Sequence, residues 1–319
     1  MCLILKRNTI YRDDEVNLLL YYMVNCLVNK KHRREKRMST PLTIDELRGM
    51  SVKEAILLGA DVISPAQKEA RKGKPKDNYK EGNRQFTMVR EEIKEVNEYL
   101  SLENSGVMMF LLGFAKLGEN GSLYYREEGK ESELLSASKL ADLLGKTPRA
   151  TNIILAELEK LSLIVRTKKG RNTTISLGEQ FFNVGSYEGK DLFTKVYKGK
   201  LLEVAKKISF SELGLFFKLL GHFHYDLHVL VDNPHEVKVS ELNIWSRKHV
   251  APSVGCSADF AKRAILKLIR AGLLMEISSA KKLIILNPLL VSKKLRTPNI
   301  KELAEAIELA SFTRENFKK

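Results

Sequence analysis

Apolar residues recur at helical spacing along most of this chain, and runs that alternate as a strand does are short and few. In the front part, this spacing predicts a helix over residues 13–37 and a second one from about Thr43 or Asp45 to Leu58. Residues 64–85 are polar and rich in Lys, Gly and Pro, which is typical of a linker. We therefore expect an N-terminal helical region over residues 1–63, followed by a basic linker.

The rest of the chain contains an internal repeat. The segment from Phe86 to Phe114 resembles the one from Phe193 to His222, and both contain the same Leu-Leu-Gly triplet at the same place. Further on, Leu158–Ile164 recurs as Leu268–Leu274. Matches in the same order at offsets of 107 to 110 residues predict two copies of one domain, over residues 86–184 and 193–292. A tail with one helix, residues 293–319, is expected to follow.

Each copy is predicted to contain several helices and then a β-hairpin. In the first copy the expected helices are Met88–Leu100, Ser105–Leu117, Ser138–Gly145 and Arg149–Leu161, with a short strand at Leu123–Tyr125 and a hairpin over residues 163–177. In the second copy we expect a short strand at Val237–Val239, helices at Ser240–Val250 and Ser257–Ala271, a long turn between them, and strands at Leu273–Ile277 and Lys282–Leu286.

A short helix, a turn, a longer helix and a hairpin are the order of a winged helix-turn-helix. The stretch from Ser138 to Gly145, followed by Leu158–Ile164, resembles the MarR-like winged helices, although Ser162 stands where that family has Gly. The second copy has the Gly, at Gly272. The fold class that this implies is α+β, mostly α, with two tandem winged-helix domains. That tandem arrangement resembles the replication initiators of plasmids and phages, in which one copy often supports dimerisation and the other reads origin repeats.

The charge of the chain points to a polyanionic partner. Lys and Arg number 54 against 39 Asp and Glu, which gives a formal net charge of +15. Residues 1–85 carry +7 and residues 193–319 carry +10, whereas residues 86–184 are close to neutral at −1. Within that neutral copy, however, residues 146–172 hold seven basic residues and two acidic ones. Because the basic residues gather on the predicted second helix and hairpin, double-stranded DNA is favoured over a membrane surface.

The expected DNA contacts lie at the start of the second helix of each pair and at the tip of each hairpin. Arg suits guanine and Asn suits adenine in the major groove, and Lys on a hairpin suits phosphate. The candidates are Thr147, Arg149, Asn152, Lys168, Lys169 and Arg171 in the first copy, and Ser257, Lys262, Arg263, Lys281 and Lys282 in the second. The alternative for these basic residues is a solvated helix face with no ligand.

Two enzymatic alternatives rest on the histidines around position 224. The sequence His222-Phe-His224 has the His-hydrophobic-His form of metal-dependent nicking enzymes, but the tyrosine and lysine spacing of such sites fails at Leu201. His224 and His228 are four residues apart, as zinc ligands on a helix can be, but no cysteine pair lies nearby. We therefore expect no catalytic residue, no metal and no cofactor.

The function predicted from the sequence is sequence-specific binding of double-stranded DNA, by a plasmid or phage replication initiator. The alternatives are a MarR-like transcriptional regulator of a mobile element and, third, the nicking enzyme. Three widely separated cysteines indicate a reducing compartment, so the cytoplasm is expected, and no apolar run has the length of a membrane span. The apolar face of residues 13–37 suits either a homodimer contact or docking on the first copy, and the sequence leaves that choice open.

Overall fold

The computed structural model describes residues 85–319 except 118, 120, 128, 171, 186–191 and 295. The contacts divide the chain into Met1–Lys76 and Asp77–Lys319, and the described residues all belong to the second unit. The expectations for residues 1–84 therefore lie outside the described part. This part is α+β: nine α-helices accompany small sheets whose strands all pair antiparallel.

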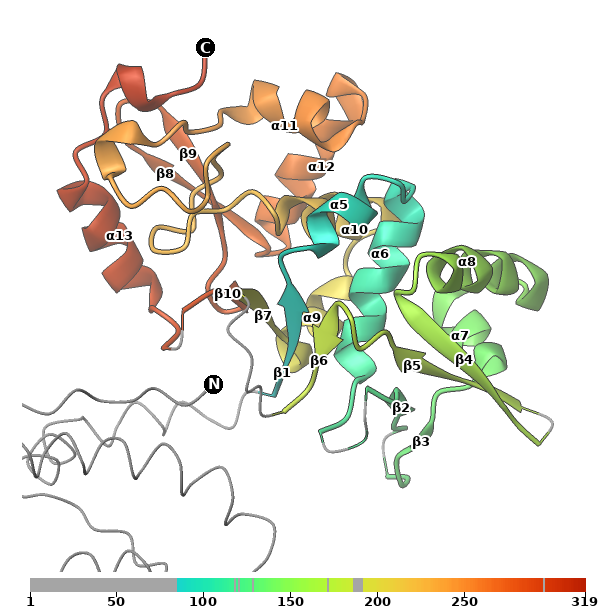
Figure 1. Cartoon of the computed structure of the whole chain (residues 1–319). Coiled ribbons are helices and arrows are strands. Elements are labelled where there is room, and N and C mark those ends of the chain that lie inside the picture. The colour runs from blue at the N-terminus through green and yellow to red at the C-terminus, as the bar shows by residue number, and fades with distance from the viewer. Residues whose placement is uncertain are drawn as a thin grey trace, which may run out of the picture. The chain divides into compact units, whose positions relative to one another are not determined.

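A four-stranded sheet joins the two copies of the repeat (Figure 1). Its strands are β1 (Phe86–Arg90), β6 (Phe182–Asn183), β7 (Phe193–Tyr197) and β10 (Val291–Ser292), in the order β10-β7-β1-β6. β1 and β7 are equivalent strands of the two copies, and Met88 pairs with its own counterpart, Lys195. Antiparallel pairing of equivalent strands about equivalent residues indicates that an approximate two-fold axis relates the copies.

The helices behind this sheet follow the same approximate symmetry. They are α5 (Ile93–Asn97), α6 (Leu102–Leu111) and the 3₁₀ turn η2 (Leu112–Phe114) in the first copy, and α9 (Lys198–Ala205) and α10 (Phe210–Leu219) in the second. α6 and α10 cross at Gly106 and Gly214, where a Cβ atom on either glycine would lie 1.7 Å from a carbonyl oxygen of the other helix. Only glycine permits this approach, so the backbones of the two copies are in direct contact.

Each copy then continues into a helix–hairpin unit, a name used here for two helices and the hairpin that follows them. The first unit contains α7 (Ala137–Leu144), α8 (Pro148–Lys160), β4 (Ile164–Lys169) and β5 (Asn172–Leu177). The second contains α11 (Arg247–Val254), α12 (Ala258–Arg270), β8 (Leu274–Ser278) and β9 (Lys282–Leu286). Residues 141–160 and 251–270 have the same burial class at every position, although only three of these twenty pairs share an amino acid.

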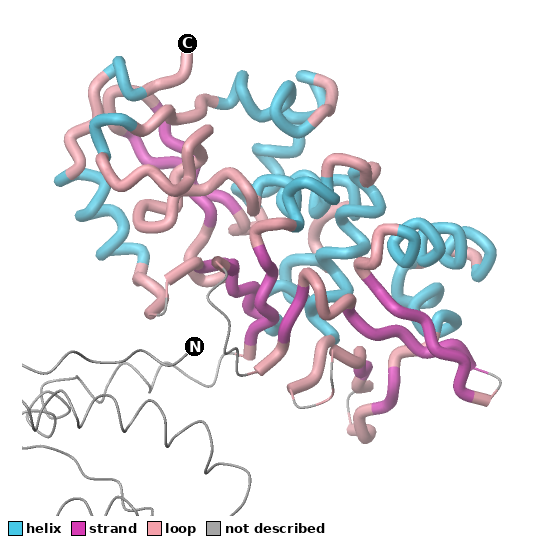
Figure 2. The backbone as a smooth tube through the Cα atoms, in the orientation of Figure 1, coloured by secondary structure: helices cyan, strands magenta, loops and turns pink. Residues whose placement is uncertain are grey.

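The core runs through both copies. Met108 and Met109 on α6 and Phe216 and Phe217 on α10 are fully buried or nearly so, and they belong to one hydrophobic cluster that extends to both helix–hairpin units. A second cluster covers the far side of the β8–β9 hairpin with the loop before α11 and with the tail. The tail contains α13 (Ile300–Leu309) and η4 (Arg314–Asn316), and Figure 2 shows how much of the loop before α11 is irregular.

Four sequence-based assignments were wrong. Residues 86–90 form a strand, not the start of a helix, because β7 and β6 pair with it on both edges. Residues 237–239 are not a strand, and the first helix of the second unit starts at Arg247, after η3 (Val239–Glu241), not at Ser240. That helix continues through Pro252 and ends at Gly255 in the left-handed conformation, so the turn after it is as short as in the first copy. The short strands near Tyr124 are β2 (Tyr124–Tyr125) and β3 (Glu133–Leu134).

Candidate nucleic-acid interface

The second helix of the first unit is fixed by its turn. Gly145 ends α7 in the left-handed conformation, with φ of 61°, and the Thr147 side chain caps α8 by accepting the N–H of Ala150 at 3.2 Å. Pro148 is the first residue of α8, where a missing N–H costs nothing. The buried face of α8 carries Thr151, Ile154, Leu155 and Leu158, so its opposite face is left to solvent.

The second unit has the same design. Gly255 ends α11 with φ of 73°, and the Ser257 hydroxyl accepts the N–H of Phe260 at 3.3 Å. The buried face of α12 carries Ala261, Ala264, Ile265 and Leu268 at the positions that match the buried face of α8. Lys262 and Arg263 are exposed, as Asn152 and Ile153 are on α8. Each copy thus presents one helix whose outer face begins directly after a tight turn.

One polar contact ties each of these helices to the central pair. In the first copy the side-chain amide of Asn104 on α6 donates to Glu157 on α8, and in the second copy Lys267 on α12 forms an ion pair with Glu212 on α10, at 2.6 Å. Burial opposes the charge of Glu212, but the hydrogen bonds from Lys267 and Ser209 outweigh it and hold the pKa below its usual value. The two copies therefore make the same connection with different chemistry.

The basic side chains of the two units divide into those that pair with a carboxylate and those that form no ion pair with a described one. Arg166 on β4 donates to Glu159 at 2.6 Å, and Arg247 on α11 donates to Glu276 at 2.6 Å, so these charges are neutralised within the protein. By contrast, a set of basic side chains on α8, on α12 and on the two hairpins is exposed and forms no ion pair with a described carboxylate. This set is Arg149, Lys160, Lys168, Lys169, Lys262, Arg263, Arg270, Lys281 and Lys282.

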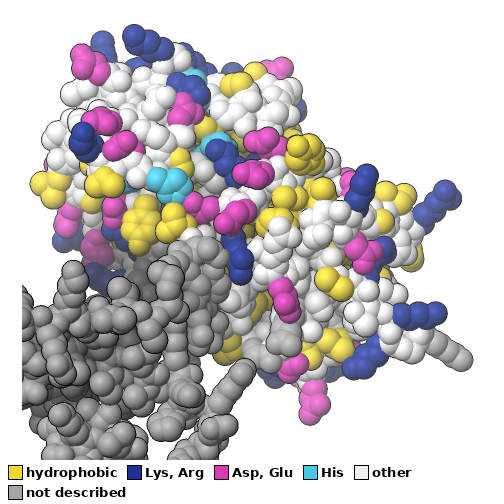
Figure 3. All heavy atoms as spheres, viewed as in Figure 1, with side chains coloured by type: hydrophobic (Ala, Val, Ile, Leu, Met, Phe, Trp, Pro, Cys, Tyr) yellow, Lys and Arg dark blue, Asp and Glu magenta, His cyan; other side chains and the backbone are white. Residues whose placement is uncertain are grey.

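The structure places most of the predicted site residues on these exposed surfaces. In Figure 3, Lys and Arg side chains project from the edge where α8 and the β4–β5 hairpin lie in Figure 1. The Nε of Arg263 donates to the backbone oxygen of Asp259 at 3.3 Å, and Lys281 lies over the Phe317 ring at 5.2 Å. Thr147 and Ser257 act as helix caps, a role that uses their oxygen atoms as acceptors. Arg171 lies outside the described residues.

Sequence reasoning missed two basic residues of this surface. Lys160 and Arg270 are exposed at the ends of α8 and α12, and they occupy matching positions. The signal was available, because the two residues follow the same offset of 110 as Leu158 and Leu268. Basic residues in the last turn also stabilise a helix end, which gives these two a structural role as well.

The three histidines between residues 222 and 228 are buried or half-buried and contact other parts of the protein. The Nε2 of His224 lies 2.8 Å from the backbone oxygen of Glu236, and its Nδ1 accepts the N–H of Leu227 at 3.2 Å. His222 stacks on Trp245 with ring centroids 4.5 Å apart, and Nδ1 of His228 lies 3.3 Å from the backbone oxygen of Leu286. Burial lowers the pKa of both His222 and His228 to about 4, so both are neutral near pH 7. Among the described residues, no group of three His, Cys, Asp or Glu side chains is arranged to hold a metal ion.

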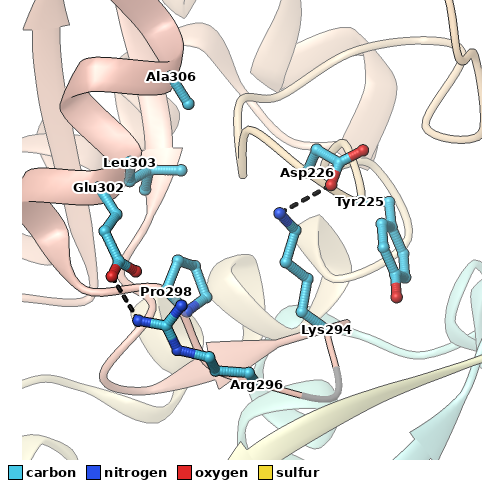
Figure 4. Close-up of a pocket in the computed structure, with 8 residues that line it drawn as sticks. All are labelled: Tyr225, Asp226, Lys294, Arg296, Pro298, Glu302, Leu303 and Ala306. Atoms are coloured by element: carbon cyan, nitrogen blue, oxygen red, sulfur yellow. Dashed lines mark hydrogen bonds and ion pairs between the residues drawn. The ribbon is translucent and has the colours of Figure 1, made fainter. Parts of the chain in front are cut away.

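A hollow of about 420 Å³ lies between the tail and the loop before α11 (Figure 4). Its charged groups already have partners: Lys294 pairs with Asp226 at 2.7 Å, and Arg296 pairs with Glu302. Figure 4 shows the two ion pairs at separate places along the hollow, with each lysine or arginine directed at its own carboxylate. The hollow therefore differs from the α8 and α12 surfaces, where exposed basic residues form no ion pair with a described carboxylate.

Comparisons with protein-family models, with curated proteins and with solved structures returned no match. Among the described residues, no helix has the length and apolar character needed to cross a membrane. The interface described above therefore rests on the geometry and charge of this chain alone.

Proposed function

We propose that this protein binds double-stranded DNA sequence-specifically, and that each helix–hairpin unit is a winged helix-turn-helix. The observation that carries the proposal is the repeated outer surface: α8 and α12 each follow a tight turn, and each is flanked by a hairpin whose exposed lysines form no ion pair with a described carboxylate. A helix presented in this way fits the major groove, and lysines on a hairpin beside it reach phosphates.

The process that this arrangement fits best is replication initiation at a plasmid or phage origin. Because the two units belong to one chain, a single molecule carries two reading helices that differ in sequence, and it needs no second copy to contact two segments of DNA. Two-fold symmetric dimers read palindromes. A chain with two different readers is suited to an asymmetric site, which can be repeated in one direction along an origin.

Binding to a random-sequence DNA library, with repeated selection by the full chain, tests this function. We expect an enriched sequence and an affinity that falls steeply with salt, because each phosphate contact releases counterions. The double variant Lys262→Ala with Arg263→Ala should bind the enriched sequence at least about ten-fold more weakly, since each lost contact costs about 1–3 kcal/mol.

The matched control is Lys301→Ala. Lys301 lies on α13, which packs on the far side of the β8–β9 hairpin, and 87% of its side chain is exposed. This variant therefore removes a surface charge that lies on neither reading helix and on neither hairpin. Its affinity should stay within about two-fold of the unchanged protein. Failure to enrich any sequence, or equal affinity for enriched and random DNA, would refute sequence-specific binding.

A further inference from the structure

The two reading helices present different chemistry at matching positions. Residues 141–160 and 251–270 agree in burial class throughout, so an offset of 110 pairs each exposed residue of α8 with one of α12. On α8 the exposed face has Arg149, Asn152 and Ile153, and on α12 the matching residues are Asp259, Lys262 and Arg263. An amide and an aliphatic side chain therefore stand where the second unit has two cations.

Ile153 is the unusual member of this face. Its side chain is 56% exposed, although it lies in the first half of α8 beside the exposed Asn152. The core of the first unit is supplied by the opposite face of the helix, so Ile153 contributes little to folding. A β-branched residue is also a weaker helix former than Ala or Lys, so neither packing nor helix propensity explains its presence.

The chemistry of Asn152 and Ile153 matches an A·T base pair in the major groove. Asn forms two hydrogen bonds with the N6 and N7 atoms of adenine, and thymine alone among the bases of DNA carries a 5-methyl group in that groove, where an aliphatic side chain can cover it. Apart from the ring of Pro148 at the very start of the helix, Ile153 is the exposed aliphatic side chain in the first two turns of α8. The cations at the matching positions of α12 suit guanine or phosphate instead.

Resting on the proposed function, we infer that Ile153 contacts a thymine methyl group, so that the half-site read by α8 contains a required A·T pair and differs from the half-site read by α12. The approximate two-fold relation of the copies then orients two readers of unlike specificity on one stretch of DNA. Asn152 and Ile153 set the specificity for the first half-site, and Lys262 and Arg263 contact guanine or phosphate in the second half-site.

The test replaces single thymines by uracil in the DNA that the full chain selects. Uracil pairs as thymine does but lacks the methyl group, so the change isolates one apolar contact. For the unchanged protein, we expect one thymine position at which uracil weakens binding by about three- to five-fold, the effect of exposing about one methyl group. The Ile153→Ala variant should bind thymine and uracil at that position equally.

Leu266→Ala is the control. Leu266 on α12 is 37% exposed and corresponds to Ala156 on α8, so this variant removes an apolar side chain from the other reader. It should keep the full uracil effect at the Ile153 position. If the unchanged protein shows no uracil effect, or if Ile153→Ala retains it, the inference is overturned while sequence-specific binding stands. If no DNA sequence is selected at all, the proposed function itself fails.

Discussion

Replacing Gly106 by Ala tests whether the two copies are held together by direct backbone contact. A Cβ atom at this position would lie 1.7 Å from the backbone oxygen of Phe210, 2.6 Å from its carbonyl carbon and 3.0 Å from the nitrogen of Gly214. The atoms that it meets belong to backbone in the middle of the core and cannot rotate away. Relief therefore requires α6 and α10 to separate by about 1.5 Å, which would loosen the packing along both helices.

The expected cost can be estimated from core overpacking. Inserting a methyl group into a packed core costs about 1–3 kcal/mol, and more when the backbone must move. We expect Gly106→Ala to lower the free energy of unfolding by about 3 kcal/mol or more, the upper end of this range. At a urea dependence of about 3 kcal/mol per molar, this lowers the unfolding midpoint by about 1 M. Trp245 is the only tryptophan of the chain and is fully buried, so its fluorescence reports this unfolding.

Gly199→Ala is a matched control with the opposite expected sign. Gly199 lies in α9, and a Cβ atom added there would meet nothing within 4 Å. The substitution should raise stability by up to about 1 kcal/mol, because Ala favours a helix more than Gly does. Equal midpoints for Gly106→Ala and the unchanged protein would refute the close contact and, with it, the rigid pairing of the two copies.

Further measurements test other parts of the structure. Ser162 has a φ of 57°, and the matching residue of the second copy, Gly272, has a φ of 80°. Because this left-handed conformation favours glycine, Ser162→Gly should stabilise the protein by about 1 kcal/mol and Gly272→Ala should destabilise it by a similar amount. Urea unfolding measures both changes. The pKa of His222 is about 4 in the folded protein and about 6.5 in the unfolded chain. The free energy of unfolding should therefore fall as the pH is lowered from 6.5 to 4, and His222 should contribute up to about 1.4 kcal/mol per pH unit to this fall. If His222→Leu shows the same pH dependence of unfolding as the unchanged protein, this reasoning is contradicted. Lys267→Ala leaves the buried Glu212 without its cation and should cost about 1 kcal/mol in thermal unfolding; no loss would mean that the ion pair contributes nothing.

The first helix–hairpin unit, together with α12 and the hairpin after it, is the part of the fold that the sequence predicts best. Its signals are local: a capping Thr147 or Ser257, apolar residues every three or four positions, and a Gly after the first helix of the first unit. The prediction of α8 was wrong by only one residue at each end. Such signals suffice because helices and tight hairpins depend on neighbours in sequence.

The errors occur where distant segments or unusual residues decide the structure. The stretch Met88–Leu100 has apolar residues at helical spacing, yet β1 forms because β7, more than a hundred residues away, pairs along its whole length. In the second copy Pro252 suggested a turn, but it lies inside α11. That helix begins after Ser246, whose N–H donates to Nδ1 of His249 at 3.0 Å. Neither partner strand nor cap is visible in a local hydrophobic pattern.

The sequence places the two helices that carry the candidate surface, but it does not show which of their basic residues have partners. The repeat and the helix boundaries placed the outer faces of α8 and α12 correctly. The partners of the cations, however, depend on tertiary contacts: Arg166 and Lys267 look as available as Lys168 and Lys262 in the sequence, yet each of the first two meets a carboxylate. Charge counts alone therefore overstate the positive surface.

The comparison between the copies separates what the fold requires from what is free to vary. Between residues 141–160 and 251–270 every burial class is kept, yet among the exposed positions only the glycines at 145 and 255 are the same residue. Those glycines have positive φ and are required by the turn. Packing therefore fixes the inward positions and the turn, and leaves the outward ones open. If the outer faces were only solvated, they would need no particular chemistry. If they read two halves of one DNA site, the halves differ where the residues differ: Asn152 stands at the position of Lys262, and Ile153 at the position of Arg263.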